Sequence, residues 1–213
     1  RTTVYDFGQN ASLSVRLKTR GSKGSRVRIE PSELLHADGT IDSGSTRRGL
    51  ASWDYILAGS DSPEVFQSRF WYHGARYLQV TVESADAGGE LPSVEELTGL
   101  VIHSVAEPVG EFRCSSELWT RTRELVRWAQ RSNMASVFTD CPHRERLGWL
   151  EQVHLNGPSL RYEFGLQSFY RKVFGDMADA QTDYGLVPNI APEYVIFPSD
   201  FRDSPEWGAA LFQ

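Results

Sequence analysis

The sequence has little cysteine and no marked excess of positive charge. Its 213 residues include two cysteines, too few for a disulfide framework. The net charge is −6 and the basic residues are scattered, so the chain lacks the basic footprint of a nucleic-acid-binding protein. No apolar run is long enough to cross a bilayer. We therefore expect neither a nucleic-acid nor a membrane partner, and a neutral or small-molecule ligand fits better.

The two cysteines, Cys114 and Cys141, are expected to be buried free thiols, because a free cysteine packs like a small apolar residue. They favour neither a secreted or periplasmic protein nor a cytoplasmic one. The chain opens at Arg1 without a signal-peptide pattern and stops inside an apparent element at 211–213. We therefore expect a fragment of a longer protein and leave its localisation open.

Aromatic residues are plentiful. Six Trp, eight Tyr and eleven Phe accompany a hydrophobic content of 40%, which is enough for one large domain or two small ones. Most of these rings belong in a core, but sugar-binding clefts also use aromatic rings as flat platforms.

Residues 1–108 carry the alternation of apolar and polar residues that is typical of half-buried strands. The pattern is clear at 13–17 and again at 77–82. Glycine-rich turns recur between such stretches. A last strand is expected at 100–105, after a stretch rich in Gly, Pro and Glu at 88–96. Short strands with frequent turns predict an antiparallel β-sandwich domain.

A second, helical domain is predicted at 109–213, where the apolar residues recur at helical spacing. Ser115 or Ser116 can cap a first helix that has Glu117 in its first turn and extends to about Asn133. The same reasoning predicts a helix at 150–164, another at 166–180, a Pro-rich loop at 187–204 and the start of a fourth helix at Pro205. The expected fold class is multidomain β + α.

The segment 139–156 carries the candidate chemistry, because Asp140, Arg144 and Glu145 cluster around Pro142. If a helix begins near Arg144, one of its faces presents Glu145, Trp149, Gln152 and Asn156. That face combines an acid, a stacking ring and two amides, which are the groups that a sugar needs.

A structural interpretation of the same residues stays open. A glutamate flanked by Arg144 and Arg146 is often a solvated ion pair of little energetic consequence, and Trp149 can be part of a core. His143 and His154 are more often structural than catalytic when they stand alone. No two histidines lie at metal-ligand spacing with a third ligand, so we expect neither a metal site nor a cofactor.

The run Asp140-Cys-Pro-His-Arg-Glu-Arg-Leu-Gly-Trp149 closely resembles the active-site signature of glycoside hydrolase family 78, the bacterial and fungal α-L-rhamnosidases. Residues 5–10, 33–39, 53–57 and 70–77 resemble the β-sandwich that precedes the catalytic domain in that family, and residues 112–139 resemble the first helix of its α/α toroid. The resemblance implies an antiparallel β-sandwich followed by the first helices of an α/α toroid.

The resemblance also implies roles for individual residues. Glu145 takes the position of the general acid that protonates the leaving glycosidic oxygen. Asp140 and Arg144 take positions that bind rhamnose hydroxyls, and Trp149 lines the sugar pocket. Members of the family invert the anomeric centre with a distant second glutamate as base, which falls beyond residue 213.

Two positions depart from the family's pattern. Gln152 stands where the family has an aspartate that contacts the sugar, and an amide can hydrogen-bond hydroxyls but carries no charge. Further on, Trp207 keeps its place in the substrate-binding set, but Ala209 replaces an aspartate. Both changes bear on the substrate.

The sequence therefore predicts a glycoside hydrolase that releases terminal α-L-rhamnose with inversion from a rhamnose-containing oligosaccharide or glycoside. One alternative is a rhamnose–glucuronate lyase of similar toroidal fold, which releases an unsaturated uronate. The other is a non-catalytic carbohydrate-binding fragment. We expect this fragment to be inactive alone and count a homodimer of the full-length protein among its partners.

Overall fold

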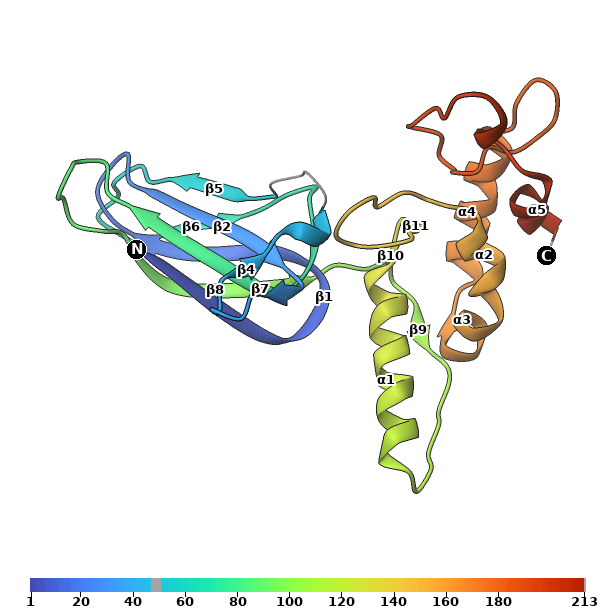
Figure 1. Ribbon diagram of the computed structural model, residues 1–213, viewed down its shortest axis with the longest axis horizontal. Coiled ribbons are helices and arrows are strands. Elements are labelled where there is room, and N and C mark those ends of the chain that lie inside the picture. Colours follow the sequence, from blue (N-terminus) through green and yellow to red (C-terminus); the bar gives the residue numbers. More distant parts are fainter. Residues whose placement is uncertain (47–50, 213) are drawn as a thin grey trace. The chain divides into compact units, whose positions relative to one another are not determined.

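A computed structural model of the chain describes residues 1–46 and 51–212 and divides into two compact units (Figure 1). The first unit comprises Arg1–Ile102 together with Pro142–Arg144, and the second comprises His103–Cys141 and Glu145–Gln213. The predicted domain boundary after residue 108 stays a prediction. In the described residues, no helix is both long enough and apolar enough to cross a bilayer.

The first unit is made of antiparallel strands. They are β1 (Thr2–Arg20), β2 (Arg26–Ser32), β3 (Leu34–Leu35), β4 (Ile41–Asp42), β5 (Trp53–Ile56), β6 (Glu64–Gln67), β7 (His73–Glu83) and β8 (Ser93–Val101), with a 3-10 turn η1 (Gly44–Thr46). The main sheet has the order β5-β2-β7-β1-β6, and β8 also pairs with β1.

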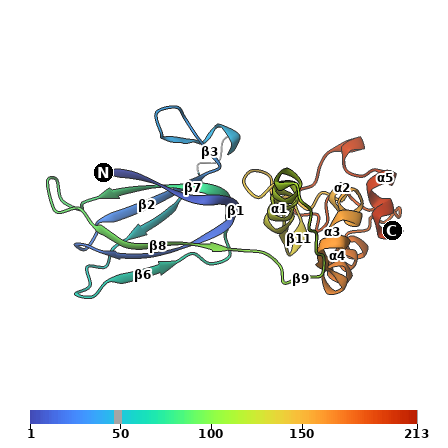
Figure 2. The same ribbon diagram turned by 90° about the horizontal axis from the view of Figure 1, so that it is seen from below.

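Strand β1 belongs to two layers because it changes partners near Leu13. Its first part pairs with β7, and the register shifts between Asp6 and Ala11. From Leu13 to Arg20 it pairs with β8, and between Arg16 and Thr19 with β6 on its other edge. Figure 2 shows β2 and β7 in one layer and β6 and β8 in the other. The predicted β-sandwich is confirmed.

The core of the sandwich contains the apolar residues that alternate in the sequence. Leu13, Val15 and Leu17 on β1 are at most 3% exposed, and Val27 and Ile29 on β2 are equally buried. Two layers cover both sides of β1 where it crosses between them, so the polar residues Ser12 and Ser14 are buried there too. Their hydroxyl groups form hydrogen bonds with Ile102 O and Ser68.

The last strand differs from its prediction. We expected it at 100–105, but β8 begins at Ser93 and ends at Val101. The Glu-rich stretch is a strand because its carboxylates form ion pairs with basic residues of the neighbouring strand β1. Glu95 lies 3.2 Å from Lys18 Nζ and 3.5 Å from Arg20 Nε. Cross-strand pairs of this kind stabilise a sheet.

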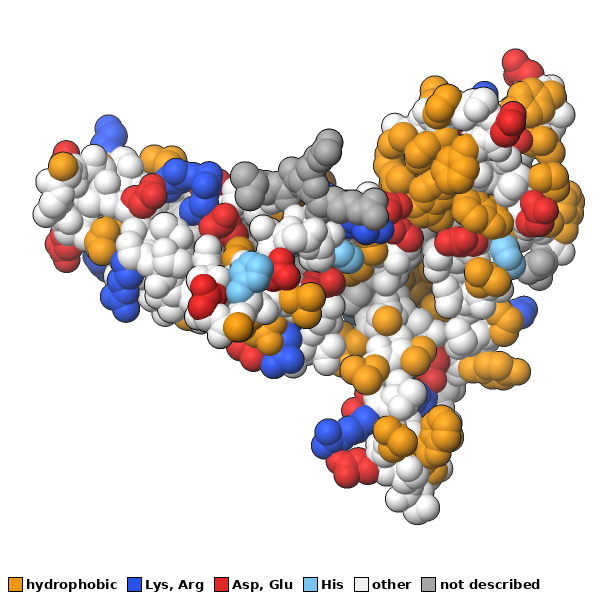
Figure 3. Space-filling view, in the orientation of Figure 1, with side chains coloured by type: hydrophobic (Ala, Val, Ile, Leu, Met, Phe, Trp, Pro, Cys, Tyr) orange, Lys and Arg blue, Asp and Glu red, His pale blue; other side chains and the backbone are white. Residues whose placement is uncertain are grey.

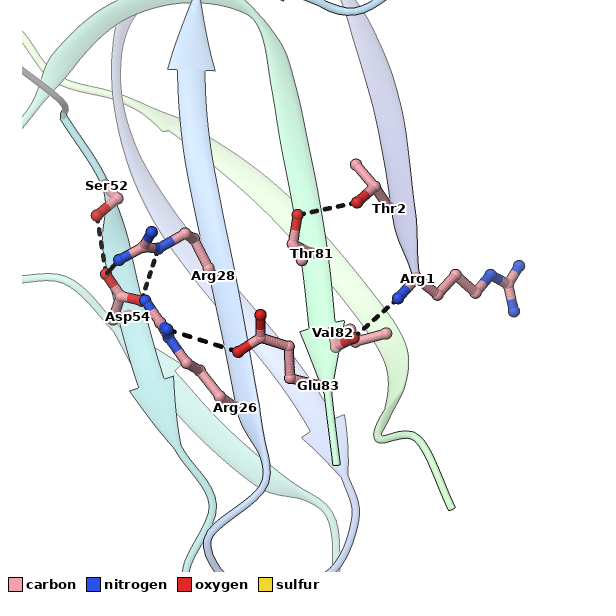
Figure 4. Close-up of polar contacts among 9 residues, drawn as sticks. All are labelled: Arg1, Thr2, Arg26, Arg28, Ser52, Asp54, Thr81, Val82 and Glu83. Atoms are coloured by element: carbon pink, nitrogen blue, oxygen red, sulfur yellow. Dashed lines mark hydrogen bonds and ion pairs between the residues drawn. The ribbon is translucent and has the colours of Figure 1, made fainter. Parts of the chain in front are cut away.

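A charged cluster spans β5, β2 and β7 on one face of the sheet (Figure 4). Asp54 accepts hydrogen bonds from Arg26 Nε at 2.6 Å, Arg28 Nε at 2.9 Å and Ser52 Oγ at 2.8 Å. Burial disfavours the charged carboxylate, yet these bonds prevail and lower the pKa of Asp54 to about 2. The cluster therefore keeps its charges at neutral pH and ties the edge strand β5 to the sheet.

The second unit is mainly helical. Its helices are α1 (Glu117–Ser132), α2 (Glu151–Leu155), α3 (Gly157–Glu163), α4 (Gln167–Asp179) and α5 (Pro205–Gly208), with 3-10 turns η2 (Ser199–Phe201) and η3 (Ala209–Phe212). Short strand pairs join β9 (Glu107–Pro108) to β12 (Phe164–Gly165) and β10 (Met134–Ala135) to β11 (Val137–Phe138).

Most of the predicted helices are confirmed. Helix α1 begins after Ser116, whose carbonyl accepts the Thr120 N–H at 3.2 Å, and α4 and α5 lie where the apolar spacing and Pro205 placed them. The single helix expected at 150–164 is instead two, α2 and α3, which meet at Asn156. Pro158 explains the break, because a proline inside a helix has no N–H to donate and its ring clashes with the carbonyl group one turn earlier.

The core of the second unit joins the hairpin β10–β11 to helices α2, α3 and α4. It includes Met134, Phe138, Leu150, Leu160, Phe169, Val173 and Met177. Glu163 at the end of α3 is tied to α1 by two hydrogen bonds from Arg123, 2.7 and 2.9 Å long. Helix α1 is thereby held against the rest of the unit by charge as well as by packing.

Two features of the second unit differ from expectation. The apolar residues of α1 that suggested a core face are at the surface (Figure 3): Leu118 is 71% and Leu125 66% exposed. Cys114 is exposed rather than buried, since it lies in the stretch before α1, where its thiol donates to Ser116 O at 3.2 Å. Cys141 is half-buried.

Candidate active site

The segment Asp140–Trp149 is a tight loop and not the start of a helix. We expected a helix from near Arg144, but helix α2 begins only at Glu151, so this prediction is wrong. Arg146 has a positive φ of 55°, a left-handed conformation that a continuous helix excludes. Two local contacts close the loop: Glu145 N donates to Cys141 Sγ at 3.2 Å, and Leu147 N donates to Asp140 Oδ1 at 3.3 Å.

A strip of antiparallel pairing holds the end of this loop. Ala191 N donates to Gly148 O at 3.1 Å, and Leu150 N donates to Asn189 O at 2.9 Å. Gly148 is required for this approach, because a Cβ atom there would lie 2.6 Å from the Ala191 carbonyl oxygen. The motif's glycine therefore lets two backbone segments meet, which fixes the position of Trp149 beside them.

Glu145 and Trp149 are joined directly. The indole Nε1–H of Trp149 donates to Glu145 Oε2 at 3.0 Å. Trp149 is only 8% exposed, whereas Glu145 is an exposed residue. A buried, rigid ring thus holds a carboxylate at the surface, and a hydrogen bond to a charged group is stronger than one between neutral groups.

Trp149 is the centre of an aromatic cluster. Phe197 stacks on its ring at a centroid distance of 5.1 Å, and Phe201 and Trp207 contact it edge-on at 5.9 and 5.7 Å. The structure thus brings together Trp207 and Trp149, two of the residues that the sequence predicts to bind the substrate. We did not single out Phe197 and Phe201 in the sequence, although both lie in the Pro-rich loop, and loops of that length in helical arrays are usually functional.

The hydroxyl group of Tyr194, a residue of the Pro-rich loop, contacts the segment Asp140–Trp149. Tyr194 Oη donates to Arg146 O at 2.8 Å and so supports the left-handed residue. Burial raises the pKa of Tyr194, and the negative charge of Asp140 adds to the shift. The phenol is therefore neutral at physiological pH and keeps the proton that it donates to Arg146 O.

Gln152 lies in a different environment from Glu145. It lines a cavity of about 170 Å³ together with Asn156, with Ala129 and Gln130 of α1, and with Asn133, which follows α1. Its amide donates to Glu151 Oε1 at 3.1 Å, and its carbonyl oxygen accepts from Asn156 Nδ2 at 2.6 Å. Gln152 on α2 and Asn156 directly after it are therefore neighbours, as their spacing predicted.

Arg144 falls in the first unit with Pro142 and His143, whereas Glu145 falls in the second. The general acid candidate thus follows directly on a tripeptide that packs with the sandwich strands. Among residues 1–46 and 51–212, no three His, Cys, Asp or Glu side chains are placed to hold a metal ion.

The loop that carries Phe197 and Phe201 is closed by an ion pair. Arg202 donates two hydrogen bonds of 2.8 Å to the carboxylate of Glu193. The hydrogen bonds from Arg202, together with its positive charge, hold the pKa of Glu193 below its ordinary value of 4.5. Asn189 N also donates to Arg202 O at 2.7 Å, so both ends of the loop are tied.

Hydrophobic side chains of this loop gather at the surface (Figure 3), with Ile196 71% exposed.

This ion pair makes the loop sensitive to acid. Because the folded pKa of Glu193 is lowered, its stabilisation is complete above about pH 4.5 and is lost as the pH falls through the lowered value. Arg202→Met should weaken the loop at neutral pH and remove this acid dependence. Hydrogen exchange of residues 189–203, corrected for intrinsic rates, should be about fivefold faster in the variant.

The matched control is Arg113→Met, whose ion pair with Glu111 is almost fully exposed. It should leave the loop's exchange unchanged. Equal exchange in wild type and Arg202→Met at neutral pH, or an acid dependence that persists in the variant, would contradict the assignment.

The chain matches known proteins over nearly its whole length. Residues 107–213 match the bacterial α-L-rhamnosidase six-hairpin glycosidase domain, and residues 1–103 match the bacterial α-L-rhamnosidase concanavalin-like domain. An α-L-rhamnosidase from Streptomyces avermitilis is 36% identical over 190 residues, which are 89% of this chain and 18% of that protein.

Solved structures agree with this match. The α-L-rhamnosidase from Dictyoglumus thermophilum superposes with a TM-score of 0.86 at 35% identity, over 99% of this chain and 23% of that one. The Streptomyces avermitilis enzyme complexed with L-rhamnose gives 0.84 at 33% identity, over 98% and 20%. The chain thus spans about a fifth of the length of these relatives. With both of its units matched, the chain belongs to the bacterial α-L-rhamnosidases of glycoside hydrolase family 78, as the concanavalin-like sandwich and the beginning of the six-hairpin domain.

Proposed function

We propose that the full-length protein containing this chain is an α-L-rhamnosidase with Glu145 as its general acid. The observation that carries the proposal is the 3.0 Å hydrogen bond from the buried Trp149 indole to the exposed Glu145 carboxyl group, within the loop that has the family's motif. A catalytic acid must reach the substrate while its own orientation is fixed, and this pair meets both requirements. An ordinary solvated ion pair needs no such buried donor.

In the proposed reaction, Glu145 transfers its proton to the glycosidic oxygen as the bond to the anomeric carbon breaks. A water molecule attacks that carbon from the opposite face and gives its proton to a second carboxylate, which lies beyond residue 213. The products are free rhamnose of inverted configuration and the alcohol. Because the second carboxylate is outside this chain, the fragment alone is inactive.

The proposed sugar cradle uses the remaining residues of the site. Asp140 and Arg144 offer an acceptor and a forked donor to rhamnose hydroxyls. Trp207 supplies the more accessible ring, since Phe197 covers a face of Trp149. Gln152 contributes an amide from α2 in place of a carboxylate. Trp149 then contacts the sugar at its ring edge while it orients Glu145.

The test is the product of the full-length protein acting on a rhamnose disaccharide. We expect free L-rhamnose, with the inverted anomer first in time-resolved proton NMR, and no new ultraviolet absorbance. An unsaturated uronate from a rhamnosyl-glucuronate substrate would indicate a lyase instead. Sugar binding without turnover would indicate a binding module. Retention of the anomeric configuration would contradict the proposed inversion alone.

A further inference from the structure

The tripeptide Pro142–Arg144, which immediately precedes Glu145, packs with strands of the first unit. We propose that Gly74 and Glu33 of the sandwich are positioning residues for the active-site loop. They hold this tripeptide and through it the residues on either side. The expected effect on turnover rests on the proposed function, but the expected effect on the position of the loop does not.

Gly74 provides the first contact. Strand β2 pairs with β7 only from Tyr77 onward, so it leaves the start of β7 without that neighbour. There the Gly74 N–H donates to the Pro142 carbonyl oxygen at 2.8 Å. A backbone group at a sheet edge that would otherwise need water is thus satisfied by the active-site loop.

The same position has no room for a side chain. A Cβ atom on Gly74 would lie 2.6 Å from Pro142 Cγ and 3.1 Å from Glu33 Oε1. Pro142 is a buried residue with a rigid ring, so it cannot rotate away as a long flexible side chain can. Any larger residue at 74 must therefore push the loop away from the strand.

Glu33 provides the second contact. Its Oε2 lies 3.4 Å from His143 Nδ1, and its Oε1 accepts a hydrogen bond from Asn10 Nδ2 at 2.9 Å. The side chains of Glu33 and His143 are 19% and 17% exposed, so the pair is well covered. Asn10 thus orients Glu33 from β1, and Glu33 in turn faces the histidine of the motif. This assigns His143 a structural use.

These two contacts act on the residues that flank them. The tripeptide is bounded by Cys141, which accepts the Glu145 N–H, and by Glu145 itself. A displacement of about 1 Å at a reacting group can cost on the order of 10²-fold in rate even when the change is remote. We therefore expect the sandwich unit to contribute to turnover without touching the substrate.

The experiment compares Gly74→Ala, Glu33→Ala and Glu33→Gln in the full-length protein. Gly175→Ala on α4 is the matched control, because a Cβ atom there meets nothing within 4 Å. For Gly74→Ala and Glu33→Ala we expect kcat/KM on a rhamnoside to fall about 10- to 100-fold. Glu33→Gln should recover most of the loss, because an amide can still accept from Asn10 and donate to His143.

A structural readout accompanies the kinetics. Amide hydrogen exchange of His143 and Arg144, and tryptic cleavage after Arg144, should both accelerate in Gly74→Ala and Glu33→Ala but not in the control. Circular dichroism checks that each variant is folded.

Unchanged exchange at 143–144 in both variants would overturn the proposal, as would wild-type turnover in both. If the wild-type protein itself turns over no rhamnoside, the proposed function fails. In that case the exchange measurement still shows whether Gly74 and Glu33 hold the loop. If Glu33→Gln loses as much kcat/KM as Glu33→Ala, the proposed role of Glu33 is refuted, whereas that of Gly74 is not affected.

Discussion

Replacing Glu145 with Gln in the full-length enzyme should lower turnover of a rhamnose disaccharide by about 10²- to 10⁴-fold, the usual cost of losing a general acid. The amide keeps the size of the side chain and an oxygen that can accept the Trp149 N–H, but it has no proton to transfer. The loop geometry should therefore be preserved. Circular dichroism and an unchanged melting temperature would verify this.

The leaving group provides a sharper criterion. An activated aryl rhamnoside needs little protonation as it departs, so Glu145→Gln should lose much less activity on it than on the disaccharide. The matched control is Glu111→Gln, an 82% exposed carboxyl group away from the motif, which should behave as wild type on both substrates. Equal losses on the two substrates would show that Glu145 acts by some means other than proton transfer.

Trp149 should have the second largest effect. Trp149→Ala removes a buried ring from the aromatic cluster, and truncation of such a side chain typically costs about 3–5 kcal/mol. Trp149→Phe keeps an aromatic ring but removes the Nε1–H that holds Glu145. Because a hydrogen bond to a charged group contributes about 1.5–3 kcal/mol, Trp149→Phe should lower kcat by roughly tenfold or more.

The two variants separate packing from orientation. Trp149→Ala should speed hydrogen exchange in the loop of Phe197 and Phe201, which rest on the indole, whereas Trp149→Phe should change it little. Trp119→Phe, at a 62% exposed position on α1, is the control. Full activity of Trp149→Phe on the disaccharide would mean that the indole N–H is not needed to orient the acid.

The fold could be predicted from the sequence where one local pattern decided it. Alternation at 13–17 identified the core strand, and Phe169, Val173 and Met177 identified α4, because burial on one face is a property of neighbouring residues. The spacing likewise predicted that Glu145 and Trp149 share one face, and their side chains do form a hydrogen bond. That prediction used the wrong geometry, because it placed the two residues about one turn apart on a helix, and the segment is a loop.

The predictions that failed depended on distant contacts. The pairing of Gly148 with Ala191 and the left-handed Arg146 replace the expected helix, and neither can be read from residues 140–150 alone. The aromatic cluster escaped notice for the same reason, since Phe197 reaches Trp149 across many intervening residues. The assignment of β8 failed because glutamates look like loop residues until Lys18 is placed opposite them.

The two-layer course of β1 has a consequence for the order of folding. Its partners β7 and β8 end at Glu83 and Val101, so about sixty to eighty residues beyond Arg20 must be synthesised before the pairing of β1 is complete. Contacts of such long sequence separation slow folding. The Pro142 carbonyl that meets Gly74 arrives later still. During synthesis, the strands of the sandwich are therefore complete before residues 142–144 emerge to occupy the sheet edge at Gly74.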